Sequence, residues 1–363
     1  MPLPTRISVI GGGLSGLSSA FHLSRRFPSA QVTLVEQSPR LGGWVHSERV
    51  QVRDESGNEA GILLERGPRT LRPNSKAVLE LIHLLNLAPS LLTVPKTAPA
   101  ARTRFLHIPG THGLTALPSS PADFLTSALG RAMARAGALE PLRRYPESVA
   151  RLAADDGDES LDEFLSARLG PGLARILGSS LANGIYAADS RILSVRAAFP
   201  SLWALARTGR GSIVRGMLSD AVRGGRPQAA DDYELGSVPD IMENTSVYSF
   251  RDGMATLVDA MEKALLGSPN VDIIRNDSVV SITRTAQDGG AVLRTRSGRE
   301  VPASHLVSAI PLPALHTLLA QSSLPPLPHL TANPAASVTV ASLVFPPTAP
   351  GQPPLHPAGF GYL

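Results

Sequence analysis

The stretch Ile7-Ser8-Val9-Ile10-Gly11-Gly12-Gly13-Leu14-Ser15-Gly16 decides how the first part of the chain folds. A largely apolar run predicts a strand, and glycines in the spacing G-x-G-x-x-G follow it before a helical pattern opens at Leu14. The first glycine of such a motif allows a tight turn, the second lets the backbone approach a pyrophosphate, and the third lets helix and strand pack closely. The N–H groups at the start of the helix then face the phosphates.

A second apolar run, Val32-Thr33-Leu34-Val35, ends on Glu36, which lies 20 residues after Gly16. A carboxylate at that strand end can bind ribose hydroxyls, and it disfavours the 2′-phosphate of NADP. A glycine motif alone is weak evidence, because Gly-rich turns are common. The strand, the helix and the acid together make dinucleotide binding the favoured interpretation.

A second glycine pair separates FAD from NAD. Arg40-Leu41-Gly42-Gly43 follows four residues after Glu36. This extra turn resembles the second glycine motif of the glutathione-reductase-like flavoproteins, especially the flavin amine oxidase superfamily. An NAD dehydrogenase has no need of it, so we predict FAD as the cofactor.

The composition indicates a globular protein with more than one domain. The chain has 363 residues, of which 43% are hydrophobic and 18% charged, and the net charge of +4 is modest for this length. Without a Lys/Arg block or interleaved aromatic residues, we expect no nucleic-acid partner. The absence of cysteine excludes disulfides, thiol catalysis and a cysteinyl-linked flavin, so FAD is expected to be bound non-covalently. We see no secretory signal and no run of about 18 apolar residues for a spanning helix.

Periodicity divides the chain into an α/β beginning, a helical middle and an α+β end. Helical patterns cover 14–27, 76–87, 121–138, 173–181, 196–207, 212–223 and 254–266, and Ser160-Leu161-Asp162-Glu163 predicts a further capped helix. Strand patterns beyond the first two cover 105–108, 271–274, 279–283, 291–295, 305–310 and 336–345. We therefore predict a helical insertion at 117–223 within an α/β framework.

Four blocks of sequence resemble the oxygen-dependent protoporphyrinogen oxidases of the flavin amine oxidase superfamily. The first is the glycine motif with the Arg40 turn and Trp44. The others are Leu64–Pro73, Asn183–Leu202, and Phe250–Met254 with Val307–Pro311. The second and third blocks are the most specific for that family.

The resemblance implies a Rossmann-like FAD-binding domain of glutathione-reductase type with an α+β substrate domain and a helical, membrane-contacting insertion. The FAD-binding domain would comprise 1–98 and 224–282, the substrate domain 99–116 and 283–363, and the insertion 117–223. It also implies the cofactor-binding residues, which are Gly11, Gly12, Gly13, Leu14, Ser15, Gly16, Glu36, Arg40, Gly43, Trp44, Gly67, Pro68, Arg69, Thr70 and Val279. In the family a C-terminal Gly-rich block completes the FAD site, and this sequence stops before such a block, so the resemblance implies either a fragment or an unfinished site, with an incomplete substrate domain.

For the substrate, the resemblance implies a tetrapyrrole, with Arg104 pairing a propionate and Gly184 near the ring. An arginine suits a carboxylate because its planar fork makes two bonds. The implied reaction oxidises protoporphyrinogen IX to protoporphyrin IX in the penultimate step of haem synthesis, with O₂ as acceptor and H₂O₂ as product. No catalytic base and no metal site are expected. The resemblance also implies that the protein binds monotopically to the surface of the mitochondrial inner membrane. Whether it forms a homodimer is left open.

Two alternatives are left open by the residues. One is a related flavin oxidase or desaturase for an amine or a polyene, and the other is a non-catalytic flavin-fold fragment. Arg104 would then be an ordinary exposed arginine, Arg69 a partner of Glu65 or Glu80, and Trp44 a core aromatic residue.

Overall fold

The computed structural model describes residues 3–108, 113–222, 232–285, 289–322, 324–346, 348 and 351–352. They divide into two compact units. The sheet unit comprises the described parts of 3–95, 233–335 and 340–346. The helical unit comprises the described parts of 96–222, with residues 232, 336–339, 348 and 351–352.

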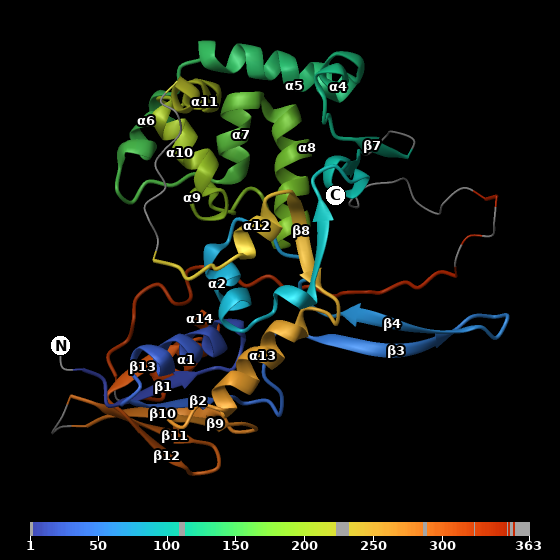
Figure 1. The fold of residues 1–363 in the computed structure, drawn as a ribbon. Helices are drawn as coiled ribbons and strands as arrows, with labels where there is room; N and C mark the ends of the chain where they lie inside the picture. The colour runs from blue at the N-terminus through green and yellow to red at the C-terminus, as the bar shows by residue number, and fades with distance from the viewer. Residues whose placement is uncertain are drawn as a thin grey trace. The chain divides into compact units, whose positions relative to one another are not determined.

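The elements of the sheet unit, coloured blue to cyan and yellow to red in Figure 1, are β1 (Arg6–Ile10), α1 (Leu14–Arg26), β2 (Gln31–Val35), β3 (Ser47–Arg53), β4 (Glu59–Glu65), α2 (Lys76–Leu84), η1 (Ala88–Ser90), β5 (Leu91–Pro95), α12 (Val238–Met242), β8 (Thr245–Phe250), α13 (Ala255–Leu266), β9 (Val271–Ile274), β10 (Val279–Arg284), β11 (Ala291–Thr295), β12 (Glu300–Ala303), β13 (His305–Ser308) and α14 (Leu312–Ala320).

A four-stranded parallel sheet in the order β13-β1-β2-β9 lies at the centre of this unit. Alternation along β1 sends Ile7 and Val9 into a core with α1 and α13, because successive side chains of a strand point to opposite faces. Ile10 faces the other core, beneath the antiparallel sheet β10-β11-β12. Figure 1 shows this layering, with α1 and α13 on one side of the parallel sheet and β10–β12 on the other. Both faces of the parallel sheet are therefore covered, as such sheets require.

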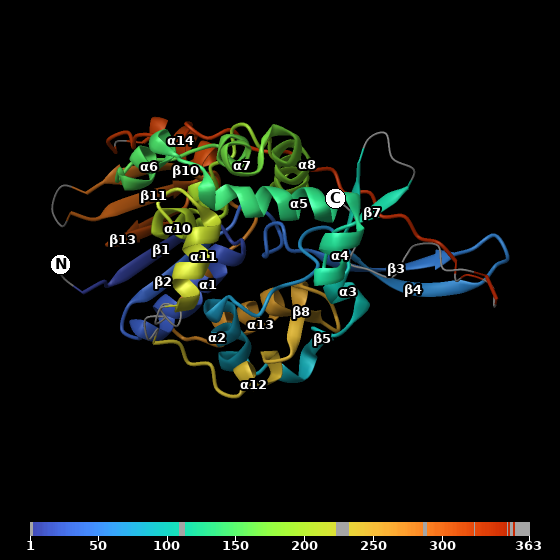
Figure 2. The same ribbon diagram turned by 90° about the horizontal axis from the view of Figure 1, so that it is seen from above.

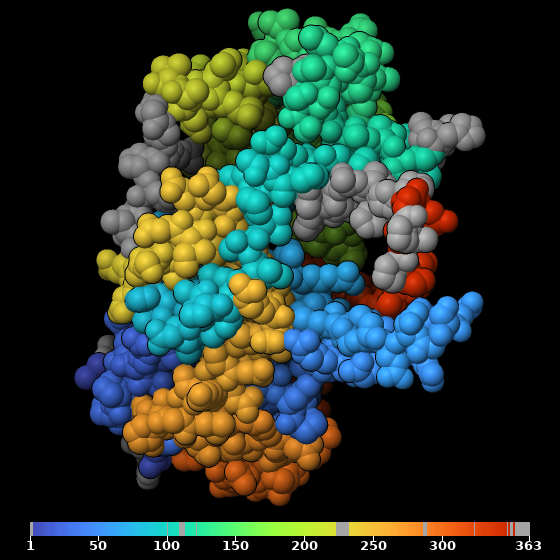
Figure 3. All heavy atoms as spheres, turned by 45° about the vertical axis from the view of Figure 1, so that its right-hand side comes forward, coloured from blue at the N-terminus to red at the C-terminus, as the bar shows by residue number. Residues whose placement is uncertain are grey.

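Two strands of the sheet unit, β3 and β4, pair in register from Ser47 opposite Glu65 to Arg53 opposite Glu59. In Figure 3 they project in light blue from the rest of the sheet unit. Their inner end, at Ser47 and Glu65, meets the start of α13, because the Ser47 hydroxyl accepts a hydrogen bond from the backbone N–H of Ala255.

The helical unit contains two short strands and a set of helices, seen from above in Figure 2. Its elements are α3 (Pro99–Arg102), β6 (Phe105–His107), β7 (Leu114–Ala116), α4 (Pro121–Thr126), α5 (Ala128–Leu139), η2 (Glu140–Leu142), α6 (Pro146–Ala153), α7 (Leu161–Leu169), α8 (Pro171–Leu181), the π-helical turn η3 (Ala182–Tyr186), α9 (Val195–Ala198), α10 (Pro200–Thr208) and α11 (Ile213–Val222).

Local signals account for most helix boundaries. The predicted capping box is confirmed, since the Ser160 hydroxyl accepts from the N–H of Glu163 while the Glu163 carboxylate accepts from the N–H of Ser160. The single helix predicted at 121–138 is wrong: Ser127 is extended and ends α4, and its hydroxyl caps α5.

The strand expected at 336–345 is also wrong. No strand is assigned in the described part of that segment, and its apolar side chains, such as Val338 and Leu343, are exposed. A strand needs a neighbour for its backbone N–H and C=O groups, and none pairs with this segment among the described residues.

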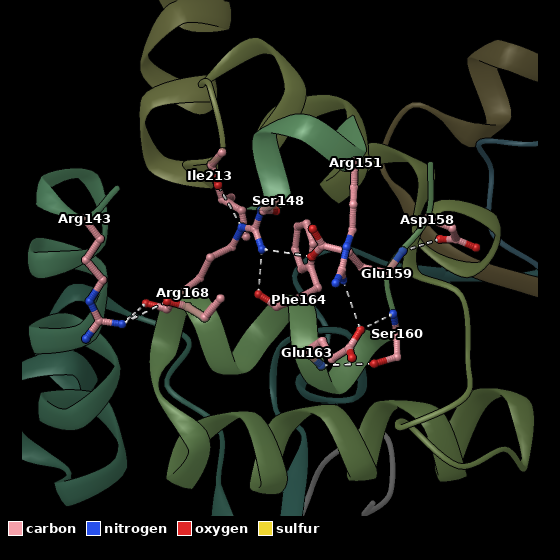
Figure 4. Close-up of polar contacts among 12 residues, drawn as sticks. Arg143, Ser148, Arg151, Asp158, Glu159, Ser160, Glu163, Phe164, Arg168 and Ile213 are labelled. Carbon is pink, nitrogen blue, oxygen red and sulfur yellow. Dashed lines mark hydrogen bonds and ion pairs between the residues drawn. The ribbon is translucent and has the colours of Figure 1, made fainter. Parts of the chain in front are cut away.

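A buried arginine holds the core of the helical unit together. Arg168 is fully buried, and its guanidinium donates to the Gly211 carbonyl at 2.9 Å, the Phe164 carbonyl at 2.8 Å and the Ser148 hydroxyl at 2.7 Å. The Glu159 carboxylate lies 3.6 Å away, and the Phe164 ring lies beneath the charge (Figure 4). Burial lowers the pKa of Arg168, and Glu159 opposes that change. The guanidinium thus joins α6, α7 and the turn before α11.

Replacing this arginine should destabilise the helical unit. Arg168→Met keeps much of the volume but leaves the Glu159 carboxylate buried without its cation, which we expect to cost about 3 kcal/mol of unfolding free energy. Arg175→Met, on the exposed face of α8, is the matched control and should change it by no more than about 0.5 kcal/mol. Urea unfolding followed by far-UV circular dichroism measures both, and equal midpoints would contradict the assignment.

Candidate functional site

The first glycine loop has the close contacts that the motif predicts. Gly11 has a φ of +101°, and its N–H donates to the Val35 carbonyl at 2.8 Å. A Cβ added to Gly16 would lie 1.8 Å from the Gly11 carbonyl oxygen. Only glycine at position 16 lets α1 approach the end of β1 this closely, so the start of the helix lies directly at the strand end.

The N-terminus of α1 offers donors to a ligand. No side chain caps the helix, and its first turn carries no acidic residue. The first N–H groups of a helix have no partner within it, which here means Leu14, Ser15 and Gly16. A Cβ on Gly13 would meet nothing closer than the Gly43 Cα at 4.0 Å, so space remains beside these donors. The arrangement fits a diphosphate, which helix N-termini bind through N–H groups and the helix dipole.

Glu36 lies at the end of β2, but its carboxylate is already hydrogen bonded. One oxygen accepts the Gly12 N–H at 2.6 Å, and the other accepts the Ser38 N–H at 2.8 Å and the Ser38 hydroxyl. A carboxylate has about four acceptor positions, so about one remains for a ribose hydroxyl. The Gly12 N–H is thereby directed to Glu36. The sequence interpretation missed Ser38, although a serine two residues after the acid was the available signal.

The second glycine loop packs on the first. The Gly42 N–H donates to the Gly12 carbonyl at 2.8 Å, and a Cβ on Gly43 would lie 3.1 Å from the Gly13 Cα. The Arg40 guanidinium donates to the carbonyl of Gly43 at 2.6 Å and to two further carbonyls at 3.2 Å. In this structure Arg40 therefore holds the loop itself in shape.

The predicted flavin-facing residues are exposed. Trp44 is 86% exposed, so the alternative of a core aromatic residue is wrong. Pro68, Arg69 and Thr70 are exposed as well. Arg69 makes no ion pair in the described part of the chain, and Glu65 hydrogen bonds elsewhere. These side chains are free to meet a ligand beside the glycine loops.

Val279 begins β10 and is half-buried. Two residues earlier, the Asp277 N–H donates to the Glu36 carbonyl at 3.1 Å, which places this segment beside the end of β2. The Asp277 carboxylate accepts the Ser297 N–H at 3.1 Å and the Ser297 hydroxyl. Those hydrogen bonds, first the one from the Ser297 side chain, hold the pKa of Asp277 below its ordinary 3.8.

The two predicted substrate residues belong to the helical unit. Arg104 directly precedes β6, is half-buried, and its guanidinium has no hydrogen bond or ion pair among the described residues. Gly184 is exposed in the π-helical turn η3, which ends at Ala187 in the left-handed conformation. Single π turns are frequent at functional sites.

Metal-ligand clusters and spanning helices are both absent from the part of the chain that the structure describes. No group of three or more His, Cys, Asp or Glu residues there is arranged to hold a metal ion. In the same residues, no helix has the length and apolar character needed to cross a membrane.

A parallel sheet with two interlocked glycine loops at the ends of β1 and β2 defines an α/β fold of the dinucleotide-binding type. The chain belongs to the flavin containing amine oxidoreductases, whose family model matches residues 14–358. Membership in this family implies a flavin cofactor.

Curated relatives carry a narrower description. Protoporphyrinogen oxidase of Homo sapiens is 34% identical over 344 residues, covering 93% of this chain, and that of Schizosaccharomyces pombe is 31% identical over 285 residues, covering 74% of this chain and 56% of the relative. Coproporphyrinogen III oxidase of Bacillus subtilis is 25% identical over 94% of this chain. The chain spans 66% of the length of the human and Bacillus enzymes.

Solved structures share the fold. A protein of Exiguobacterium sp. 255-15, described as a protoporphyrinogen oxidase, superposes with a TM-score of 0.59 at 24% identity, covering 87% of this chain and 61% of that one. Putrescine oxidase bound to putrescine gives a TM-score of 0.53 at 18% identity, covering 90% of this chain and 62% of that one. At these identities the likeness establishes the fold alone.

The glycine loops generate a matched pair of tests. Gly16→Ala places a methyl group on the Gly11 carbonyl and should lower the unfolding free energy by about 2–3 kcal/mol. Gly137→Ala, within α5 where an added Cβ meets nothing within 4 Å, should instead raise it by up to about 1 kcal/mol. Chemical denaturation measures both changes, and a neutral Gly16→Ala would refute the close approach.

The Asp277 contacts predict a pH dependence. A lowered pKa means that the ionised carboxylate is favoured in the folded state, so its stabilisation is present above the ordinary pKa of 3.8 and is lost as pH falls through the lowered value. Asp277→Asn should therefore be less stable than the wild type at pH 7, and the difference should shrink below pH 3.8. Urea midpoints measured from pH 7 to pH 2.5 test this, and a difference that does not change with pH would contradict it.

Proposed function

We propose that this chain carries the flavin and substrate machinery of a porphyrinogen oxidase that converts protoporphyrinogen IX to protoporphyrin IX in haem biosynthesis. Its similarity to the human enzyme, over 93% of the chain at 34% identity, is the observation that carries the proposal. Amine and polyene oxidation are less favoured, because curated protoporphyrinogen oxidases match at 31–34% identity, whereas putrescine oxidase shares only 18% identity and the fold. The domain division that the resemblance implies is part of this proposal.

FAD, bound non-covalently, is the proposed form of the flavin. The N–H groups of Leu14, Ser15 and Gly16 would hold the pyrophosphate, and the remaining acceptor of Glu36 would take a ribose hydroxyl. Val279 would meet the adenine, and Trp44 with the Gly67-Pro68-Arg69-Thr70 loop would pass the flavin. Bound there, FAD would supply the redox chemistry, which is uptake of a hydride from the substrate and return of the electrons to O₂ as H₂O₂. The chain's residues supply binding, orientation and charge, and we assign none of them as a base.

Arg104 is proposed to bind a propionate of the tetrapyrrole, with Gly184 allowing the backbone to approach the ring. Arg104 is half-buried, and the fork of N–H groups of a guanidinium matches a carboxylate in two bonds. Among the described residues, no acidic side chain pairs with the Arg104 guanidinium. A carboxylate of the substrate would therefore supply the acceptor that this guanidinium lacks.

We further propose monotopic binding to a membrane surface, with the mitochondrial inner membrane as the location and a homodimer as the assembly to test. Apolar side chains are exposed on adjoining elements of the helical unit, and they are Leu125, Leu139, Leu142, Met217, Leu218 and Val222. Partial burial of such side chains in a lipid interface would remove them from water.

The proposal is tested with the purified chain supplied with FAD and anaerobically prepared protoporphyrinogen IX. We expect bound-flavin absorbance, porphyrin fluorescence and peroxide in the ratio of three per porphyrin formed, because the conversion removes six electrons. Coproporphyrinogen III serves as the competing substrate. Flavin binding without oxidation of either compound would favour a flavin-fold protein that does not act on porphyrinogens.

Arg104 provides the substrate-side prediction. Arg104→Gln should raise KM for protoporphyrinogen IX about tenfold, the loss of one charge-assisted bond, while kcat and FAD affinity stay near wild type. Arg102→Gln, an exposed neighbour whose side chain bonds only the Lys96 carbonyl in the described residues, is the control. Equal KM values for the two variants would remove Arg104 from the substrate site.

A further inference from the structure

The start of α13 is held by two side chains from the β3–β4 pair. One Glu65 carboxylate oxygen accepts the Met254 N–H at 2.8 Å, and the other accepts the Ser47 hydroxyl at 2.8 Å. The same Ser47 oxygen accepts the Ala255 N–H at 2.9 Å. Two backbone donors at the helix start are thus satisfied by residues that lie opposite each other in the sheet pair. We call this set of contacts the α13 cap.

The α13 cap is a tight fit. Gly253 precedes the helix with a φ of +92°, and a Cβ there would lie 2.5 Å from the Ser47 hydroxyl oxygen and 2.7 Å from a Glu65 carboxylate oxygen. The negative charge lies at the N-terminal end of a twelve-residue helix, where the helix dipole favours it. The helix dipole and the hydrogen bonds favour a carboxylate at position 65, and only glycine at position 253 leaves room for it.

Both predicted flavin-facing loops continue directly from the α13 cap. Trp44 lies three residues before Ser47, and Gly67 lies two residues after Glu65. Between them the Arg66 N–H donates to the His46 carbonyl at 2.9 Å, and a Cβ on Gly67 would lie 2.0 Å from the Trp44 carbonyl oxygen. The Trp44 loop and the Gly67 loop are therefore in contact with each other, and both end at the α13 cap.

The second glycine loop, which contains Gly42 and Gly43, packs against the same helix. A Cβ on Gly42 would lie 3.1 Å from Cγ1 of Val258, which is on the first turns of α13. Gly42 in turn hydrogen bonds to Gly12. One helix thus contacts the pyrophosphate-side loops through Val258 and the flavin-side loops through its N-terminal cap.

We propose that Glu65, assisted by Ser47, is a positioning residue that holds the flavin-facing residues Trp44 and Gly67 to Thr70 in place relative to the glycine loops. This rests on the proposed flavin function. Glu65 touches no reacting atom and acts through α13. An amide replaces the carboxylate only in part: its oxygen can accept the Met254 N–H, but its NH₂ group can only donate to the Ser47 oxygen, so the Ser47 hydroxyl proton loses its acceptor and the helix start loses the negative charge.

The test compares Glu65→Gln and Ser47→Ala with Glu48→Gln. Glu48 is the next residue in β3, and it pairs with Arg66 on the exposed side, where an ion pair contributes little. FAD dissociation constants come from flavin fluorescence titration. We expect about tenfold weaker binding for Glu65→Gln, the loss of a hydrogen bond to a charged group, a smaller loss for Ser47→Ala, and no change for Glu48→Gln.

A second measurement needs no cofactor. The chain has two tryptophans, and Trp203 is buried while Trp44 is exposed. In a Trp203→Phe background, fluorescence anisotropy reports the motion of Trp44 alone. We expect Glu65→Gln to lower that anisotropy at a temperature where circular dichroism shows the chain folded, and Glu48→Gln to leave it unchanged. If Glu65 only stabilised the fold, Glu65→Gln would lower the unfolding midpoint but would change neither the FAD dissociation constant nor the Trp44 anisotropy.

The outcomes separate the two proposals. If the wild type binds no FAD, the proposed function fails, and the anisotropy comparison still decides the role of Glu65. If the wild type binds FAD and Glu65→Gln keeps its affinity within twofold with unchanged anisotropy, the positioning role is overturned. Should Glu65→Gln fail to fold, Ser47→Ala, which leaves the Met254 contact in place, carries both measurements.

Discussion

The close approach of α1 to β1 at Gly16 is the constraint on which the sheet unit depends. Because position 16 has no side chain, the helix starts against the Gly11 carbonyl, and its N–H groups point across the end of the parallel sheet. Glu36 then closes the edge from the neighbouring strand by accepting the Gly12 N–H. The loop is thus largely preformed by contacts within the protein, which reduces the conformational entropy that a nucleotide would have to remove on binding.

The two units differ in how their buried polar and charged groups are hydrogen bonded. At the sheet edge, backbone groups are paired with backbone, with Glu36 or with Arg40, and the donors left over lie at the start of α1. In the helical unit, a whole guanidinium is buried and surrounded by acceptors from α6, α7 and the turn before α11. The guanidinium therefore links three short segments through directional hydrogen bonds, at the cost of desolvating its charge.

Local signals in the sequence predicted the parts of the fold that local chemistry decides. The strand, glycine turn and helix from Ile7 to Arg26 follow from short-range sterics, and the capping box at Ser160 from two side chains three residues apart. Strands such as β3 and β5 were missed because their pairing, with β4 and β8, depends on partners distant in sequence. The apolar alternation at 336–345 misled for the same reason, since alternation describes a strand only where a partner is present.

In the candidate site, the types of residue could be predicted from the sequence, but the hydrogen-bond partners of each residue could not. Glycine spacing and a strand-end acid pointed to nucleotide binding, yet nothing local reveals that Glu36 is mostly engaged by Gly12 and Ser38, or that Arg40 bonds its own loop. Both charged side chains make most of their hydrogen bonds within the protein. A loop whose charged residues are already hydrogen bonded leaves uncharged N–H donors at the start of α1, so a diphosphate bound there would be recognised through the position of the backbone, to which α13 contributes by packing Val258 close to Gly42.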